Sequence, residues 1–103
     1  MIRSRDFKDV RRLIVWLLYA SRGGSTRLSI LKLLKERGPM PVSQIARALN
    51  LNYRTVIYHL EILESHDLVT KVEMPEGTMY ALSEAGLRNW DLIEKLIRGN
   101  ERR

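Results

Sequence analysis

The sequence contains no cysteine, only three prolines and six glycines, and no apolar run long enough to cross a bilayer. The absence of cysteine excludes disulfide scaffolds, thiolate zinc sites and cysteine nucleophiles. The scarcity of glycine and proline, with 45% hydrophobic residues, excludes a disordered or collagen-like chain. The longest apolar run, residues 13–20, would span about 12 Å as a helix, against a hydrocarbon core of roughly 30 Å. No signal-peptide cleavage pattern follows this run, so we expect a cytoplasmic protein.

The chain is short and basic. Its 103 residues include 18 Lys and Arg against 12 Asp and Glu, for a net charge of +6. This length suits one compact domain. A small basic domain favours a polyanionic partner, which is either nucleic acid or an anionic membrane surface, and the net charge does not choose between them.

The spacing of apolar residues and the positions of turn-forming residues predict the order of the elements. We expect helices over residues 6–20, 26–37, 44–49, 53–65 and 84–98, and strands over residues 68–73 and 79–82. The expected helix N-caps are Ser25, Ser43, Asn52 and Ser83, and the expected helix stops are Gly23-Gly24, Gly38-Pro39 and Gly99. Asn50 is expected to adopt the left-handed conformation as the chain leaves its helix. The segment at residues 40–42 is expected to add a stub to the edge of the sheet.

This order of elements, with a short helix, a tight turn, a longer helix and a hairpin, is that of a winged helix-turn-helix. The predicted fold class is therefore mainly α with a small β-hairpin wing. Ala46 is small where the two helices of the motif cross, and Val56 and Leu60 lie on the face that joins them. The stretch from residue 30 to residue 69 resembles archaeal winged helix-turn-helix transcription regulators of the ArsR-like class. We expect one domain over residues 1–103, with a winged helix-turn-helix core at 26–82 and flanking helices at 6–20 and 84–98.

The resemblance implies that the helix after Asn52 enters the major groove of DNA with its first turn foremost. Arg54 is the first candidate for a base or phosphate contact, because its planar guanidinium matches the geometry of guanine and phosphate. The residues expected to contact DNA are Ser43, Gln44, Arg47, Asn52, Tyr53, Arg54, Thr55, Tyr58 and Lys71. Further phosphate contacts are expected from Arg3, Arg5, Arg22, Arg27 or Lys32.

Some of these residues also have a purely structural interpretation. Asn52 and Ser43 can act as helix caps, and Tyr58 can pack against the wing. The wing departs from the family pattern. A wing that contacts the minor groove usually carries positive charge from Arg or Lys, whereas in this hairpin the single Lys71 lies among acidic residues. Net charge falls from +5 over residues 1–27 to −2 over residues 52–70, so the positive charge precedes the expected reading helix.

The two histidines are expected to be structural. His59 lies beside the core stripe as a half-buried residue, and His66 ends its helix, where positive charge suits the helix dipole. They lie two turns apart, about 10.5 Å along the helix axis, which is too far to share a metal ion. No cofactor is expected. The sequence also lacks paired carboxylates at a predicted cleft, a Gly-rich phosphate loop and a nucleophile beside a base, so we expect no enzyme.

Both ends of the chain carry surplus apolar residues. The helix at 6–20 is apolar nearly all round, and the helix at 84–98 has an apolar stripe. These helices either pack on each other within one subunit or form an isologous dimer, which we favour because two-fold dimers are the commonest assembly. The residues expected at the dimer interface are Leu13, Trp16, Leu17, Leu87, Trp90, Ile93 and Ile97.

The sequence therefore predicts a sequence-specific regulator of transcription that binds double-stranded DNA as a homodimer on a pseudo-palindromic site. Its two reading helices would lie roughly 34 Å apart, one turn of DNA. Two alternatives remain open. One is a winged-helix module that binds proteins within a transcription or chromatin assembly, which the acidic end of the helix at 53–65 favours. The other is a non-specific architectural DNA-binding protein.

Overall fold

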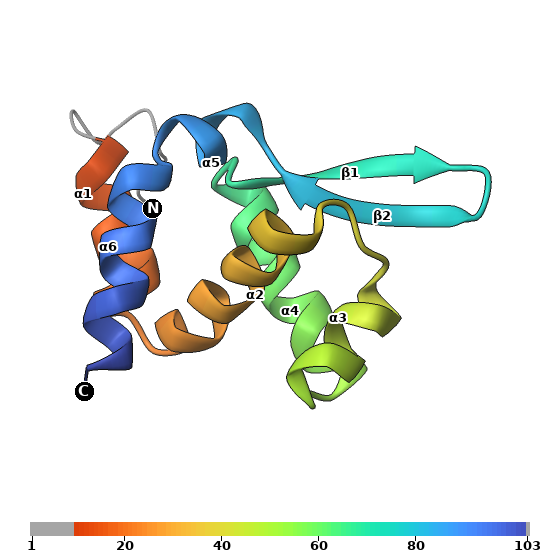
Figure 1. Cartoon of the computed structure of the whole chain (residues 1–103), viewed down its shortest axis with the longest axis horizontal. Coiled ribbons are helices and arrows are strands. Elements are labelled where there is room, and N and C mark those ends of the chain that lie inside the picture. The colour runs from red at the N-terminus through yellow and green to blue at the C-terminus, as the bar shows by residue number, and fades with distance from the viewer. Residues whose placement is uncertain (1–9, 103) are drawn as a thin grey trace.

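The structure is a computed structural model that describes residues 10–102. Its elements are α1 (Val10–Val15), η2 (Trp16–Ala20), α2 (Gly24–Arg37), α3 (Val42–Leu49), α4 (Tyr53–Ser65), β1 (Val69–Met74), β2 (Gly77–Leu82), α5 (Glu84–Arg88) and α6 (Trp90–Glu101). η2 is a π-helix that continues α1 directly. Figure 1 shows α1 and α6 side by side at one end of the molecule, and α3, α4 and the hairpin at the other. Within residues 10–102, every helix is too short or too polar to cross a bilayer.

α2 is the helix on which both ends of the molecule pack. Leu28, Ile30, Leu31 and Leu34 are all buried, so α2 is apolar on more than one face. It contacts η2 and α6 at one end of the molecule, and α3, α4 and β2 at the other (Figure 1). A helix that is hydrophobic on several faces needs partners on several sides, and here it joins the two ends through one core.

α3 and α4 form the helix-turn-helix, and the turn between them confirms the local predictions. Asn50 adopts the left-handed conformation, with φ 55° and ψ 48°. The Asn52 side chain accepts a hydrogen bond from the Arg54 backbone N–H at 2.8 Å, so Asn52 is the N-cap of α4. α4 begins and ends at the predicted residues. Val56 and Leu60 are fully buried and hold α4 against the core.

β1 and β2 form the wing as an antiparallel hairpin. The register runs from Val69 opposite Leu82 to Met74 opposite Gly77, which leaves two residues in the turn. The backbones of Met40 and Tyr80 exchange hydrogen bonds of 2.9 and 2.8 Å, which confirms the short stub expected at the sheet edge. The hairpin projects from the body in Figure 1. These elements confirm the predicted fold, which is mainly α with a winged helix-turn-helix.

Two of the predicted helix caps are wrong. α2 begins at Gly24 with the left-handed Gly23 as its N-cap, so Ser25 lies within the first turn. α3 begins at Val42 with Pro41 as its N-cap, and the Ser43 side chain makes no capping hydrogen bond. Pro41 has the extended backbone that an N-cap needs, with φ −73° and ψ 156°, and its fixed φ favours a helix start one residue later. Ser83 does cap α5, because it accepts a hydrogen bond from the Gly86 N–H at 3.0 Å.

The C-terminal helix also differs from its prediction. It is broken at Asn89 into α5 and α6, and the Asn89 side chain donates back to the Ala85 carbonyl oxygen at 2.9 Å. Gly99 does not end α6, which continues to Glu101. A Cβ on Gly99 would lie 3.6 Å from the Tyr19 ring, so α6 and η2 approach closely here. The predicted start of the first helix, at residues 6–9, lies outside the described residues.

Candidate nucleic-acid interface

The first turn of α4 is open to solvent. Asn52, Arg54 and Thr55 are exposed, and the side chains of Tyr53 and Tyr58 are 52% and 59% exposed. The opposite face of the helix carries its buried residues, so the core fixes the direction in which this turn points. Tyr58 is therefore mostly open to solvent. The exposed set offers a guanidinium, hydroxyls and a side-chain amide, which can hydrogen-bond to phosphates and base edges.

The start of α3 presents a second set of polar groups. Ser43, Gln44 and Arg47 are exposed on one face of α3, while Ile45 and Ala46 are buried on the other. No side chain caps α3, so its first backbone N–H groups are left for water or an anion. A helix N-terminus of this kind suits a phosphate group. The Ser43 hydroxyl, free of a capping role, is available beside it.

Arg27, a predicted phosphate contact, is buried instead. Its side chain is only 3% exposed, and it donates hydrogen bonds to the carbonyl oxygens of Leu17 and Arg22. A guanidinium held in this way cannot reach a DNA phosphate. Arg22 is exposed, whereas Arg3 and Arg5 lie outside the described residues.

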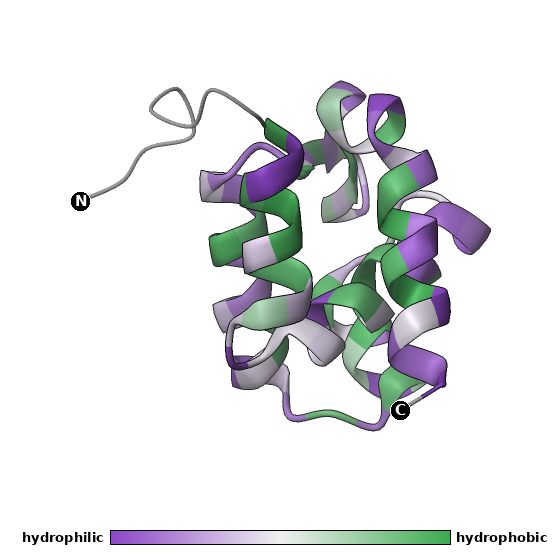
Figure 2. Cartoon of the chain, turned by 90° about the vertical axis from the view of Figure 1, so that its left-hand side faces the viewer, coloured by the Kyte–Doolittle hydropathy of each residue, from purple (hydrophilic) through white to green (hydrophobic). Residues whose placement is uncertain are grey.

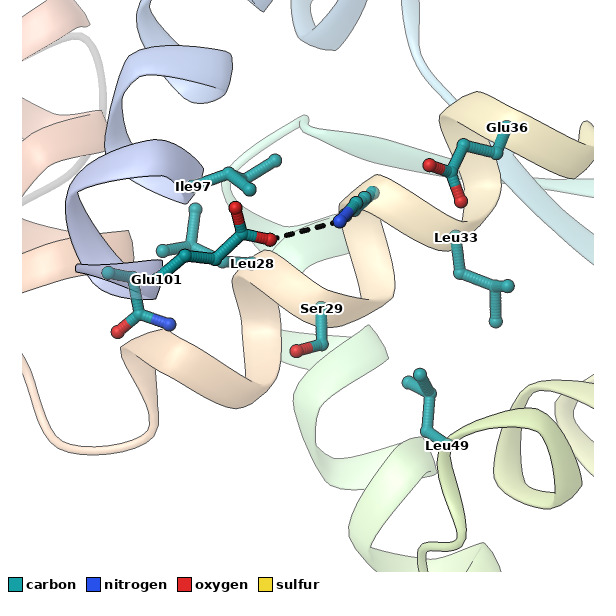
Figure 3. Close-up of a pocket in the computed structure, with 9 residues that line it drawn as sticks. Leu28, Ser29, Leu33, Glu36, Leu49, Ile97 and Glu101 are labelled. Atoms are coloured by element: carbon teal, nitrogen blue, oxygen red, sulfur yellow. Dashed lines mark hydrogen bonds and ion pairs between the residues drawn. The ribbon is translucent and has the colours of Figure 1, made fainter. Parts of the chain in front are cut away.

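Lys32, another expected phosphate contact, is held in an ion pair instead. Its Nζ lies 3.0 Å from Oε2 of Glu101, and this hydrogen bond raises the pKa of Lys32. The pair spans a cleft of about 290 Å³ between α2, α6 and the end of α3 (Figure 3). The wall of this cleft includes Leu33, Leu49 and Ile97. The positive charge of Lys32 is therefore balanced by Glu101, on the side of α2 that faces α6.

His59 is more deeply buried than predicted, at 7% exposure. Its Nδ1 lies 3.1 Å from Nη1 of Arg27. Burial lowers the pKa of His59, and the neighbouring Arg27 charge lowers it further. The contacts of His59 are those of a structural residue. Within the described residues, no three His, Asp or Glu side chains lie close enough together to hold a metal ion.

The wing carries mixed charge. Lys71 is exposed on β1, and Glu73 accepts a hydrogen bond from the Thr78 hydroxyl at 2.8 Å. Burial raises the pKa of Tyr80; Lys71 opposes this rise, and Glu64 and Glu61 of α4 add to it. The acidic end of α4 leads through Asp67 and Leu68 into β1, at the base of the wing.

The other end of the molecule exposes apolar side chains. Trp16 and Leu87 are each 52% exposed, and Val15 and Tyr19 add to the exposed apolar surface of α1 and η2. Figure 2 shows hydrophobic residues over most of the α1 and η2 ribbon, while α6 alternates between hydrophobic and hydrophilic. The remaining residues expected at a dimer interface lie deeper: Leu13, Leu17, Ile93 and Ile97 are buried within the subunit, and Trp90 is half-buried beneath the Lys35 ammonium. Those four therefore pack inside one subunit, as the alternative interpretation held.

Comparisons with known proteins agree with this geometry. Residues 24–72, from the start of α2 to β1, match the family model described as a helix-turn-helix domain. The structure of the apo-Zalpha domain of PKZ from zebrafish is 29% identical and covers 62% of this chain and 100% of that chain, with a TM-score of 0.58. No curated protein matches the chain.

Two longer solved proteins cover more of this chain at lower identity. A probable transcriptional regulator from Pseudomonas aeruginosa is 21% identical, covers 89% of this chain and 71% of that chain, and has a TM-score of 0.71. The transcriptional repressor CouR, bound to a 23-mer DNA duplex, is 18% identical, with 82% and 62% coverage and a TM-score of 0.68. The chain thus spans less than two thirds of CouR. These likenesses show a winged-helix fold, in which α3 and α4 form the helix-turn-helix.

Proposed function

We propose that this protein is a regulator of transcription that binds double-stranded DNA, acting as a cytoplasmic homodimer on a pseudo-palindromic site. α4 enters the major groove with its first turn, and the start of α3 contacts the phosphate backbone. The proposed contact residues are those of the two exposed sets, together with Lys71 on the wing.

The observation that carries the proposal is the exposed first turn of α4. Tyr53 and Tyr58 are more than half exposed, although a small domain gains by burying aromatic rings. Arg54 stands between them with no carboxylate partner among residues 10–102. A guanidinium flanked by phenol groups, on a helix end fixed by a buried opposite face, suits a phosphate-lined groove.

The known structures support the same role. CouR is a transcriptional repressor bound to a DNA duplex, and the protein from Pseudomonas aeruginosa is a probable transcriptional regulator. Both share the fold over more than four fifths of this chain. Placement in the ArsR-like class rests on the resemblance of residues 30–69 and is part of the proposal.

The dimer is supported by the exposed apolar surface of α1 and η2. Val15 and Trp16 lie four and three residues before Tyr19, so both exposed side chains adjoin Tyr19 on the helix surface. A second copy that covers this face would leave α3, α4 and the wing free, because these lie at the other end of the molecule (Figure 1). The two reading helices would then be available to two half-sites.

DNA-binding isotherms at several salt concentrations test the proposal, with genomic fragments and random duplexes as ligands. Arg54→Ala is expected to weaken binding to the preferred sequence by about 1–3 kcal/mol. Arg98→Ala is the matched control, because it removes the same charge from an exposed arginine of α6 that pairs with Glu94 at 3.6 Å. It is expected to leave sequence preference unchanged.

The other outcomes separate the alternatives. A steep salt dependence without sequence preference would instead indicate an architectural DNA-binding protein. An absence of binding to any duplex at low salt would contradict DNA binding and leave the protein-interaction module.

A further inference from the structure

A buried arginine connects η2 to α4. The Arg27 guanidinium donates through Nε and Nη2 to the Leu17 carbonyl oxygen, at 3.2 and 3.0 Å. The same Nη2 lies 2.7 Å from the Ser21 hydroxyl and 2.9 Å from the Arg22 carbonyl oxygen. Nη1 lies 3.1 Å from Nδ1 of His59. We call these five residues the Arg27 cluster.

The Arg27 cluster holds a positive charge without a carboxylate partner among the described residues. Burying a charged group is costly unless hydrogen bonds compensate it. Here the compensation comes from carbonyl oxygens at the end of η2, where the helix dipole is negative. In the π-helical turn, the Ser21 N–H donates to the Trp16 carbonyl oxygen at 2.8 Å and not to Leu17. The Leu17 carbonyl oxygen therefore accepts hydrogen bonds from side chains.

The hydrogen bond to His59 determines which ring nitrogen carries the proton. A guanidinium can only donate, so Nδ1 of His59 accepts and the proton is on Nε2. His66 has the opposite arrangement, because its Nδ1 lies 2.9 Å from the Ile62 carbonyl oxygen, which can only accept. The chain has two histidines, so the two tautomers can be told apart by spectroscopy.

The backbone also closes over the Arg27 cluster. Gly23 has φ +88°, and a Cβ at this position would come within 2.8 Å of both the Arg27 Nη1 and the His59 ring. The turn between η2 and α2 is therefore packed directly on the contact between Arg27 and α4. A glycine here allows this close approach as well as the left-handed backbone.

The cluster ends at the proposed DNA-reading surface. The His59 ring meets the Tyr58 ring edge to face, with the ring centroids 5.0 Å apart and an angle of 71° between the planes. Tyr58 is 59% exposed on α4, and the buried His59 ring is the aromatic group that its own ring contacts. At the other end, Leu17 follows Trp16, which carries the exposed apolar surface assigned to the dimer.

We propose that Arg27 is a positioning residue for DNA reading, which ties α4 to the end of η2 through His59 and so sets the placement of Tyr58. This inference rests on the proposed DNA-binding function. It goes beyond that function by assigning a specificity role to a residue that cannot touch DNA. It also gives the proposed dimer surface on η2 a direct connection to α4.

The experiment combines spectroscopy with DNA binding. In the wild type, imidazole ¹⁵N spectra are expected to show His59 protonated at Nε2 and His66 protonated at Nδ1. Arg27→Met, which keeps much of the apolar length but removes the donors and the charge, is expected to raise the pKa of His59 and to weaken binding to the preferred duplex roughly tenfold. Arg98→Met is the matched control and should change neither.

A second pair of variants covers the case in which Arg27→Met does not fold. His59→Gln keeps an acceptor for Arg27, whereas His59→Leu removes it. We expect His59→Gln to bind the preferred duplex more tightly than His59→Leu does, when both are folded. Equal affinity for these two variants would overturn the positioning role. A wild-type spectrum with His59 protonated at Nδ1 would overturn it as well.

The results also separate this inference from the proposed function. If the wild type binds no duplex, both fail together. If the wild type binds a preferred sequence and Arg54→Ala weakens it, while folded Arg27→Met binds like the wild type, only the positioning role of Arg27 is contradicted.

Discussion

The two ends of this molecule expose large side chains of different polarity. On α4, the exposed rings are Tyr53 and Tyr58, which flank Arg54 and carry hydroxyl groups. On η2 and α5, the large exposed side chains include Trp16 and Leu87, which have no side-chain group that can hydrogen-bond to a phosphate as well as an arginine does. The first surface can stay hydrated and bind a polyanion. Exposure of the second surface to water is unfavourable, so its burial would be stabilising. The contrast separates a surface suited to DNA from a surface suited to another protein subunit.

The largest expected difference in stability is between a buried leucine of α4 and an exposed leucine of α5. Leu60 of α4 is fully buried, whereas Leu87 of α5 is 52% exposed. Leu60→Ala is expected to lower the free energy of unfolding by about 3 kcal/mol, because it removes buried methyl groups and leaves a cavity. Leu87→Ala is expected to change it by less than about 0.5 kcal/mol in a dilute, monomeric sample. Urea unfolding measures both, and equal losses would contradict the burial assigned to these leucines.

The next effect concerns self-association. If the proposed dimer forms through this surface, Trp16→Ala is expected to weaken it by about 2 kcal/mol or more, as truncation of a buried interface tryptophan does. Met74→Ala is the matched control, since Met74 is another large exposed apolar residue, 41% exposed, and lies in the wing. Sedimentation equilibrium gives both dissociation constants. A wild type that stays monomeric at all concentrations, or an equal effect of the two variants, would rule out this surface as the dimer interface.

A smaller effect distinguishes the starts of α3 and α4. Asn52→Ala is expected to cost about 1 kcal/mol of stability, because the Asn52 side chain caps α4 through the Arg54 N–H. Ser43→Ala is expected to cost less than about 0.5 kcal/mol, because Ser43 makes no capping bond. Thermal unfolding compares them directly. A loss of stability in Ser43→Ala as large as that in Asn52→Ala would show that Ser43 is a cap after all.

The smallest expected effect is a pH dependence that arises in the Arg27 cluster. The pKa of His59 in the folded protein lies below its ordinary value of 6.5, mainly through burial. The unfolded chain therefore binds more protons at His59 as the pH falls below 6.5, so the free energy of unfolding decreases there and levels off below the folded-state pKa.

Unfolding of His59→Gln across this range checks the assignment, because the variant should lose this part of the pH dependence. His66→Gln is the control and should keep it. If the two variants behave alike, His59 is not the residue responsible.

Local features of the fold were predictable from the sequence. Asn50 and Asn52 bracket a turn that needs a left-handed residue and then a cap, and both signals lie within a few residues of each other. The bounds of α4 follow from this turn and from the apolar stripe that includes Val56 and Leu60. The two strands follow from the change of period after α4 and from the turn residues between them.

Some local signals were wrong as well, at Ser25, Ser43 and Gly99, but the errors about phosphate contacts concern residues far apart in the chain. Arg27 carries no local sign of burial, because two of its partners lie 10 residues earlier, at Leu17, and 32 residues later, at His59. Lys32 pairs with Glu101, which is 69 residues away. Charge and spacing alone assigned both residues to phosphate contacts. Only the packing of α2 against η2, α4 and α6 shows that Arg27 is buried and that Lys32 forms an ion pair with Glu101.

The most direct test of the account is a map of amide NMR signals as a random-sequence DNA duplex is added at low salt. We expect the signals of residues 42–44 and 52–58 to shift most, while those of residues 15–19 and 87–98 stay in place. Shifts confined to η2 and α6, with the first turn of α4 unaffected, would contradict the assignment of α4 as the DNA-reading helix.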